Sequence, residues 1–123
     1  MQRKSLYMPV PRKIIFHKQH FMEFYTKQTE VVRRKINQVL KLVETQEHIP
    51  RKFFRPIETV DGLFEIRIEM ESNIYRIFCC FDKGNLVVLF HGFQKKSQKT
   101  PPDQIARAEK LKEEYFREKE IKR

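Results

Sequence analysis

The pattern of apolar and polar positions predicts three consecutive strands in the second half of the chain. Residues 63–70, 74–82 and 86–93 are rich in Ile, Val, Phe and Leu, and short polar segments separate them. Runs of this composition between turn residues are typical of strands joined in hairpins. Because both connections are short, we expect neighbouring strands to be antiparallel.

The first of these runs alternates cleanly between apolar and charged residues. Its apolar side chains fall on one face of the strand, and Glu65, Arg67 and Glu69 fall on the other. Such alternation predicts that one face is buried and the other is not.

The next two runs are apolar on both faces, which predicts central strands. Arg76 is conspicuous there, because burying an unpaired charge in a central strand is very costly. We expect Arg76 either to pair with a carboxylate such as Glu65 or to await a ligand phosphate. The residue types favour the ion pair.

Residues 21–47 show the three- and four-residue spacing of an amphipathic helix. Thr29 and Glu30 offer a break between two helices, but the pattern favours one long or slightly broken helix that ends before Pro50. An isolated helix of this kind is marginal, so its apolar stripe must pack on the sheet.

A second helix is predicted near the C-terminus. Thr100 is a good N-cap residue, followed by Pro101 at the first helical position and Asp103 at the third. Residues 117–123 read as a charged tail that frays. The expected inner stripe consists of Ile105, Ala108, Leu111 and Tyr115.

The length of 123 residues suits one domain with one core, spanning residues 1–123. Residues 1–11 read as an irregular arm, and residues 12–17 fit a first strand. Residues 51–61 form a basic-aromatic connector, whose Phe53 and Phe54 we expect to plug the edge of the core. The fold class is α+β, with a sheet of about four strands.

The formal net charge of +10 points to an anionic partner, and nucleic acid leads among the candidates. No apolar run reaches the length of a membrane span, and the N-terminus lacks the apolar region of a signal peptide. We therefore expect a cytoplasmic protein that does not bind membranes.

Several common kinds of site are disfavoured. Cys79 and Cys80 are adjacent in a strand, so they point to opposite faces and read as buried structural residues. His17 and His20 lack neighbours at metal-ligand spacing, and no phosphate-binding glycine loop is present. We expect no metal, no cofactor and no small-molecule ligand.

What remains is a set of cations on and after the strands, and these groups suit metal-free RNA cleavage. That reaction needs a base for the 2′-hydroxyl, cations for the phosphate oxygens and an acid for the leaving oxygen. Taken alone, a basic face is more often a binding surface than a nuclease. The candidate catalytic residues are Arg76, Lys95, Lys96, Arg67, His91 and Glu65. The candidate RNA-binding residues are Arg67, Arg76, Lys95, Lys96, Lys99, Phe93, Arg51, Lys52 and Arg55.

The segments GLFEIR, IYRIF and VVLFHGFQKKSQKTP, followed by IARAEKLKEEY, resemble the HigB-like branch of the RelE/ParE toxin superfamily. That branch includes phage-derived toxin-like proteins. The resemblance covers residues 52–115. Its most specific part is the pattern GF-x-KK-x-x-KTP at residues 92–101.

The resemblance implies helices packed on one face of a small, twisted, mostly antiparallel sheet. It implies a type II toxin, held inactive by a cognate antitoxin that is usually a helix-turn-helix protein. Most relatives cleave mRNA on the ribosome without a cofactor. By position, Arg76 matches the arginine that contacts the scissile phosphate, Lys95 and Lys96 match basic residues at the end of the last strand, and Arg67 matches a position often basic.

The chain also departs from the family pattern. Some relatives transfer protons with a tyrosine or histidine near the C-terminus, whereas this tail offers only Tyr115, which reads as core. His91, Glu65 or the lysines would have to take over. Two alternatives therefore stay open: a ParE-like poison of DNA gyrase, and a non-catalytic phage-derived nucleic-acid-binding protein.

Overall fold

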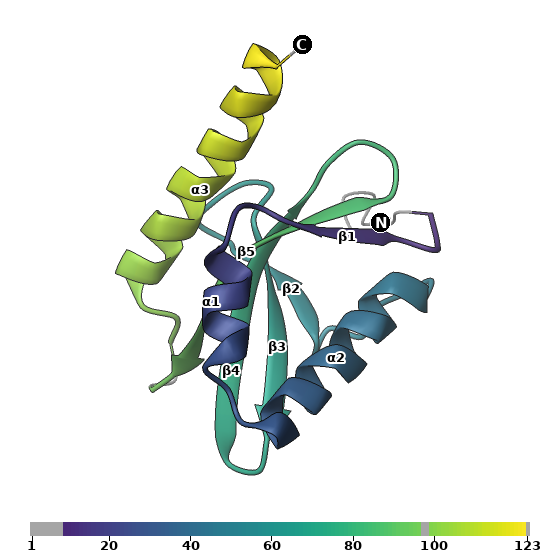
Figure 1. Ribbon diagram of the computed structural model, residues 1–123, viewed down its shortest axis with the longest axis vertical. Helices are drawn as coiled ribbons and strands as arrows, with labels where there is room; N and C mark the ends of the chain where they lie inside the picture. Colours follow the sequence, from purple (N-terminus) through teal and green to yellow (C-terminus); the bar gives the residue numbers. More distant parts are fainter. Residues whose placement is uncertain (1–8, 97–98, 123) are drawn as a thin grey trace.

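The computed structural model describes residues 9–96 and 99–122 and shows a five-stranded mixed sheet with three helices (Figure 1). Residues 1–8 of the expected arm, and Ser97 and Gln98 of the lysine-rich motif, lie outside the described residues. The elements are β1 (Lys13–Phe16), α1 (His20–Thr26), α2 (Glu30–Thr45), β2 (Phe54–Pro56), β3 (Phe64–Met70), β4 (Asn73–Phe81), β5 (Leu86–Lys95) and α3 (Pro102–Ile121).

The strand order in the sheet is β1-β5-β4-β3-β2. The antiparallel pairing of β3, β4 and β5 is confirmed, and so is the interior position of β4 and β5. Three of the four strand pairings are antiparallel, as expected, but the sheet is mixed and has five strands instead of about four. β1 pairs in parallel with β5, and part of the connector forms the short strand β2. β2 forms because Phe54 pairs with Ile66 and stacks on the Phe64 ring, 5.3 Å between centroids.

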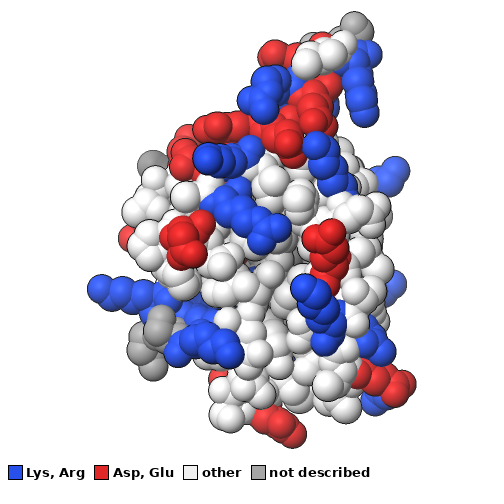
Figure 2. Space-filling view, turned by 60° about the vertical axis from the view of Figure 1, so that its left-hand side comes forward, with Lys and Arg blue, Asp and Glu red and all other residues white. Residues whose placement is uncertain are grey.

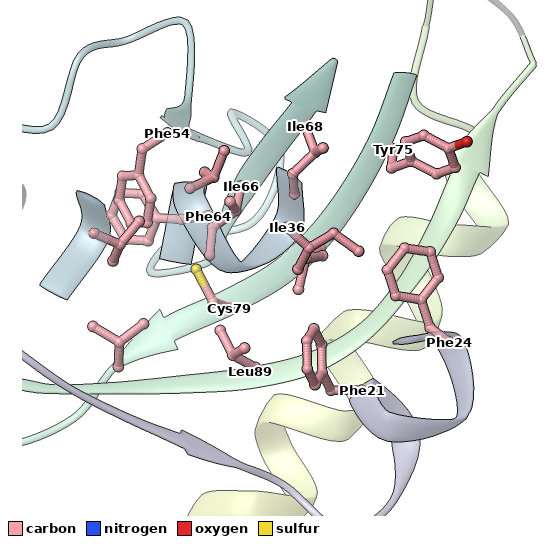
Figure 3. Packing of buried hydrophobic residues seen from close by; sticks show 14 of the residues in the cluster. Phe21, Phe24, Ile36, Phe54, Phe64, Ile66, Ile68, Tyr75, Cys79 and Leu89 are labelled. Atoms are coloured by element: carbon pink, nitrogen blue, oxygen red, sulfur yellow. The ribbon is translucent and has the colours of Figure 1, made fainter. Parts of the chain in front are cut away.

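Helices cover both faces of the sheet, which corrects the expectation that they pack on one face. α1 and α2 pack on one face through residues such as Phe21 and Ile36, which meet Ile66 and Leu89 (Figure 3). α3 packs on the other face, where Ala108 is its fully buried residue. In Figure 1 the strands lie between α3 on the left and α2 on the right. Helices are needed on both faces because β4 and β5 carry apolar side chains on both faces. Without a helix on either one, those side chains would be exposed to water.

The long or slightly broken helix expected over residues 21–47 is two separate helices, divided at the Thr29–Glu30 position that the sequence offered as a break. α1 ends at Thr26 and α2 begins at Glu30. The Thr29 side chain accepts a hydrogen bond from the Val32 backbone N–H at 3.3 Å, so Thr29 caps α2. The structure therefore decides against the preference for one helix, because the local capping preference of Thr29 overrides a continuous apolar spacing.

The N-cap of α3 is Pro101, with Pro102 as the first helical residue, so the prediction that Thr100 caps this helix is wrong. The Thr100 hydroxyl instead donates a hydrogen bond to Oε1 of Glu65, at 3.3 Å. α3 continues to Ile121, so residues 117–121 of the expected tail are helical. Over the described part of the chain, no helix is both long and apolar enough to cross a membrane.

A β-bulge in β5 changes which side chains face α3. Ile77 pairs with Gly92 and Cys79 pairs with Leu89, so two β5 residues, at 90 and 91, lie opposite Phe78. Such a bulge sends two consecutive side chains to the same face. Both Phe90 and His91 therefore face α3, whereas strict alternation would have turned one of them toward α1.

Candidate nucleic-acid interface

Three neighbouring strands carry a row of predicted site residues across the face that α3 partly covers. Arg67 of β3 lies opposite Arg76 of β4, and Arg76 lies opposite Phe93 of β5. Directly opposed residues of antiparallel strands share a face. Arg67, Arg76 and Phe93 therefore project from the same side of the sheet, next to one another.

Two further rows flank this one and are set by the same strand pairings. They are Arg55, Glu65 and Phe78 on one side, and Glu69, Ile74 and Lys95 on the other. The basic residues of the three rows thus come together from four strands around one carboxylate. We call Arg55, Arg67, Arg76, Lys95 and Glu65 the basic cluster.

The centre of the basic cluster is a buried ion pair between Arg76 and Glu65. Arg76 is 3% exposed and Glu65 is 5% exposed. Nη1 of Arg76 donates to Oε2 of Glu65, and Nε of Arg55 lies 3.9 Å from the same oxygen. The ion pair expected for Arg76 is confirmed. Thr100 adds its hydroxyl to the other Glu65 oxygen, so the segment before α3 closes over the pair.

Positive charge exceeds negative charge in this cluster, because four cations surround one buried carboxylate. Burial lowers the pKa of the Arg76 guanidinium, and Glu65 opposes that shift. Burial also lowers the pKa of Lys95, and the nearby Arg76 lowers it further. The only other close carboxylate in the described residues is the exposed Glu69, 3.7 Å from Arg67. An added anion would therefore be attracted here.

Each of the three arginines also keeps one buried nitrogen without a hydrogen bond. In the described residues, Nε of Arg55, of Arg67 and of Arg76 has no acceptor. Buried donors without partners are rare in native proteins and call for an explanation. Phosphate oxygens are suitable acceptors for such guanidinium groups.

The remaining basic candidates lie around this cluster rather than in it. Lys96 and Lys99 are exposed and follow the end of β5. Figure 2 shows Lys and Arg side chains gathered at the lower left of the view. Arg51 and Lys52 are exposed in the turn before β2, and Nζ of Lys52 lies 5.0 Å from the Phe53 ring centroid.

His91 lies on the same face but under α3. It is 1% exposed, and its Nε2 lies 2.9 Å from Oε1 of Gln104 on α3. Burial lowers the pKa of His91 to about 4, so the imidazole is neutral at physiological pH. The Phe78 ring packs against both Phe93, at 5.7 Å, and His91, at 5.0 Å between centroids. His91 thus packs against Phe78, which in turn supports the Phe93 ring beside Arg76.

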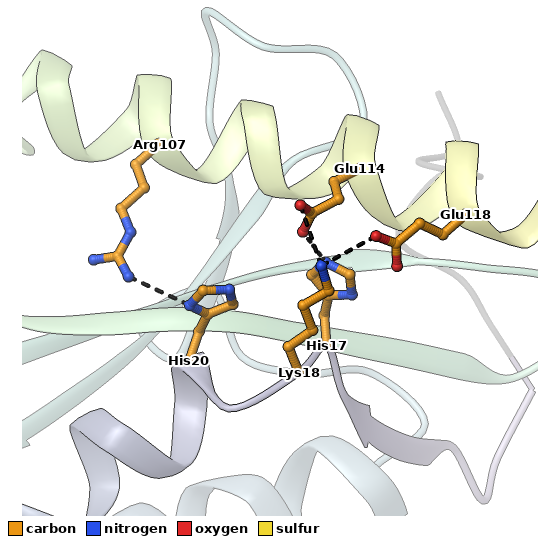
Figure 4. A network of polar contacts seen from close by, with 6 residues as sticks. All are labelled: His17, Lys18, His20, Arg107, Glu114 and Glu118. Carbon is orange, nitrogen blue, oxygen red and sulfur yellow. Dashed lines mark hydrogen bonds and ion pairs between the residues drawn. The ribbon is translucent and has the colours of Figure 1, made fainter.

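A polar network that the sequence pattern did not indicate attaches α3 to the segment after β1 (Figure 4). Nε2 of His17 lies 2.6 Å from Oε1 of Glu114, and Lys18 pairs with both Glu114 and Glu118. The next residue of α3, Tyr115, packs its ring 5.7 Å from the His17 ring and donates its hydroxyl to Asp82 at 2.6 Å. The partners are far apart in sequence, so no local signal could have paired them.

Both cysteines are buried in the core. Cys79 packs in the core under α1 and α2, and Cys80 packs under α3, as their opposite orientation predicted. Burial raises the pKa of the Cys80 thiol to about 12, so it is not a nucleophile at neutral pH. Within residues 9–96 and 99–122, no three His, Cys, Asp or Glu side chains gather as metal ligands would.

Comparison with known proteins identifies a family. The model of a family described as "Phage derived protein Gp49-like (DUF891)" matches residues 23–113, which include every residue of the basic cluster. A search of curated proteins found no match to the chain.

Proposed function

The chain belongs to the Gp49-like family of phage-derived proteins, within the RelE/HigB-like toxin superfamily, and from this we propose that it is a toxin that cleaves mRNA. The family is compatible with a toxin of a toxin–antitoxin system and implies a cognate antitoxin as partner. Our proposal adds that the chain is HigB-like, that it acts on ribosome-bound mRNA in the cytoplasm, and that its antitoxin carries a helix-turn-helix domain.

One observation carries the proposal: three arginines and a lysine from four strands meet on one face around a single buried carboxylate. The ion pair with Glu65 needs only one cation, Arg76, and the cluster holds three more. Concentrated positive charge with unsatisfied guanidinium donors favours a phosphate diester. Phe93, stacked on Phe78 beside Arg76, offers an aromatic surface for a base.

In the proposed reaction, the 2′-oxygen of a nucleotide attacks the adjacent phosphorus and the bond from phosphorus to the 5′-oxygen breaks. The products are a 2′,3′-cyclic phosphate and a 5′-hydroxyl, so one proton leaves the attacking oxygen and one joins the leaving oxygen. Arg67 and Arg76 stabilise the charge on the non-bridging oxygens. Glu65 holds Arg76 in place and is itself held by Thr100.

Lys95 is our candidate for proton transfer. Because its pKa is lowered, a larger fraction of Lys95 is in the neutral amine form than for an exposed lysine at the same pH. His91 is covered by α3 and bonded to Gln104, so we assign it to positioning the Phe78 and Phe93 rings beside the cluster. Lys96 and Lys99, with Arg51, Lys52 and Arg55, are assigned to phosphate contacts outside the reacting linkage.

The proposal is tested by primer extension on cellular mRNA after brief induction of the chain without its antitoxin. We expect new 5′ ends to appear for the unmodified protein and to disappear for Arg67→Ala, which removes one of the proposed phosphate contacts. Arg67 is chosen because its removal leaves no buried carboxylate unpaired. Arg34→Ala, at an exposed position on α2, is the matched control and should cut normally. Intact mRNA with induced DNA-damage signalling would instead indicate a gyrase poison. Intact mRNA without growth arrest would indicate a non-catalytic binder.

A further inference from the structure

A pocket lies beside the basic cluster, at the edge of β3 that β2 leaves uncovered. Its lining residues are Lys35, Lys52, Phe53, Arg67 and Glu69, and its volume is about 220 Å³. β2 pairs with β3 only as far as Ile66, and the Arg67 N–H then bonds to the Phe53 carbonyl at 2.8 Å. The pocket therefore combines a residue of α2 with the connector and the end of the strand.

Three of the five lining residues are cations, and they come from three separate segments of the chain. Lys35 belongs to α2, Lys52 to the turn before β2, and Arg67 to β3. Glu69 is largely exposed and lies 3.7 Å from Arg67, so it offsets only part of this charge. The excess of positive charge favours an anionic ligand.

Arg67 joins the pocket to the basic cluster. It lies opposite Arg76 in the sheet and contributes to lowering the pKa values of Arg76 and Lys95, yet it also lines the pocket. A phosphodiester chain seated on Arg76 can therefore continue past Arg67 without leaving positive surface. Phe53 then supplies an apolar wall, as aromatic side chains do in single-strand grooves.

The geometry points to a second nucleotide subsite: Lys35, Lys52 and Arg67 hold a phosphate of the same RNA strand, and Phe53 lies against its base. This subsite rests on the proposed function and extends it. It gives the bound RNA a path over the protein, from the reacting linkage around the edge of β3 toward α2. A volume of about 220 Å³ is below the roughly 300–1,000 Å³ of pockets for whole drug-sized ligands. It suits one unit of a chain held mainly elsewhere.

The test is binding of single-stranded RNA carrying 2′-O-methyl groups, which cannot be cut by the proposed reaction. A dinucleotide and a longer oligonucleotide are titrated against the full chain at low salt and followed by NMR shifts and fluorescence anisotropy. We expect Lys35→Glu and Lys52→Glu each to weaken binding of the longer RNA by about tenfold. Each should also reduce the slope of log K against log salt concentration by about one. Neither should change binding of the dinucleotide, which occupies the basic cluster alone.

Lys41→Glu is the matched control, because it makes the same charge change at an exposed position of α2 outside the pocket. Equal weakening by Lys41→Glu would overturn the subsite in favour of diffuse attraction. Unchanged binding in Lys35→Glu, with cleavage of mRNA intact, would overturn the subsite and leave the proposed function standing. Conversely, the expected binding pattern in a chain that cuts no mRNA would retain the subsite and refute the nuclease. Absence of RNA binding by the unmodified chain would overturn both.

Discussion

The Arg76 guanidinium and the Glu65 carboxylate form a buried ion pair across β3 and β4. The two residues are diagonal neighbours, since Glu65 lies opposite Phe78 and Arg76 lies opposite Arg67. The pair therefore has two roles in our account: it stabilises the sheet, and it presents the arginine of the proposed site in a fixed orientation. Any substitution of Arg76 tests both roles at once, so they have to be separated.

We expect Arg76→Ala to lower the free energy of unfolding by about 3–5 kcal/mol, because it leaves the Glu65 carboxylate buried and unpaired. The double variant Arg76→Met with Glu65→Leu should recover most of that loss while remaining unable to cut RNA. Urea unfolding of both proteins measures the first effect, and primer extension measures the second. If the double variant still cuts mRNA, the assignment of Arg76 to the reacting phosphate is wrong.

Lys95 gives a prediction about the pH dependence of cleavage. As a general base it acts in its neutral form, so the rate should rise with pH and level off below the usual lysine value of 10.5, because burial and Arg76 lower its pKa. Lys95→Arg keeps the charge but removes the accessible neutral amine, so its rate should be much lower and should lack the plateau. A pH–rate profile that is the same in both proteins would leave Lys95 with a charge role only.

His91 gives a prediction about acid stability. Its folded pKa is about 4 and its usual value is 6.5, so between these values the unfolded chain binds more protons than the folded one. Stability should therefore fall as the pH drops from about 6.5 to about 4, by up to about 3 kcal/mol at 1.36 kcal/mol per pKa unit. His91→Gln should flatten this slope in unfolding experiments. A slope unaltered by the substitution would place the titrating group elsewhere.

Gly92 gives a prediction about packing. A Cβ at this position would lie 2.6 Å from a ring carbon of Phe24 on α1, closer than real side chains allow. We expect Gly92→Ala to destabilise the fold by about 1–3 kcal/mol, as overpacking does. Combination with Phe24→Leu should cost less than the sum of the two single changes, which a double-mutant cycle in urea measures. Strict additivity would show that α1 has moved away without strain.

Local patterns in the sequence were sufficient for the strands that build the site. The two-residue alternation located β3, the doubly apolar runs identified β4 and β5 as interior strands, and adjacency alone placed Cys79 and Cys80 on opposite faces. The cost of an unpaired buried charge was enough to expect a carboxylate beside Arg76. Each of these inferences depends on side-chain direction within one strand or on solvation, and both follow from nearby residues.

Other features needed the folded chain. The bulge opposite Phe78 turns His91 toward α3, and the Thr100 hydroxyl reaches Glu65 instead of capping a helix. The helix on the second face and the pocket that joins Lys35 to Arg67 likewise bring together segments distant in sequence. Residue spacing encodes which way a side chain points within its own element. Which side chains meet depends on the packing free energy of the whole core, in which a local preference such as that of Thr100 for a helix cap is one small contribution.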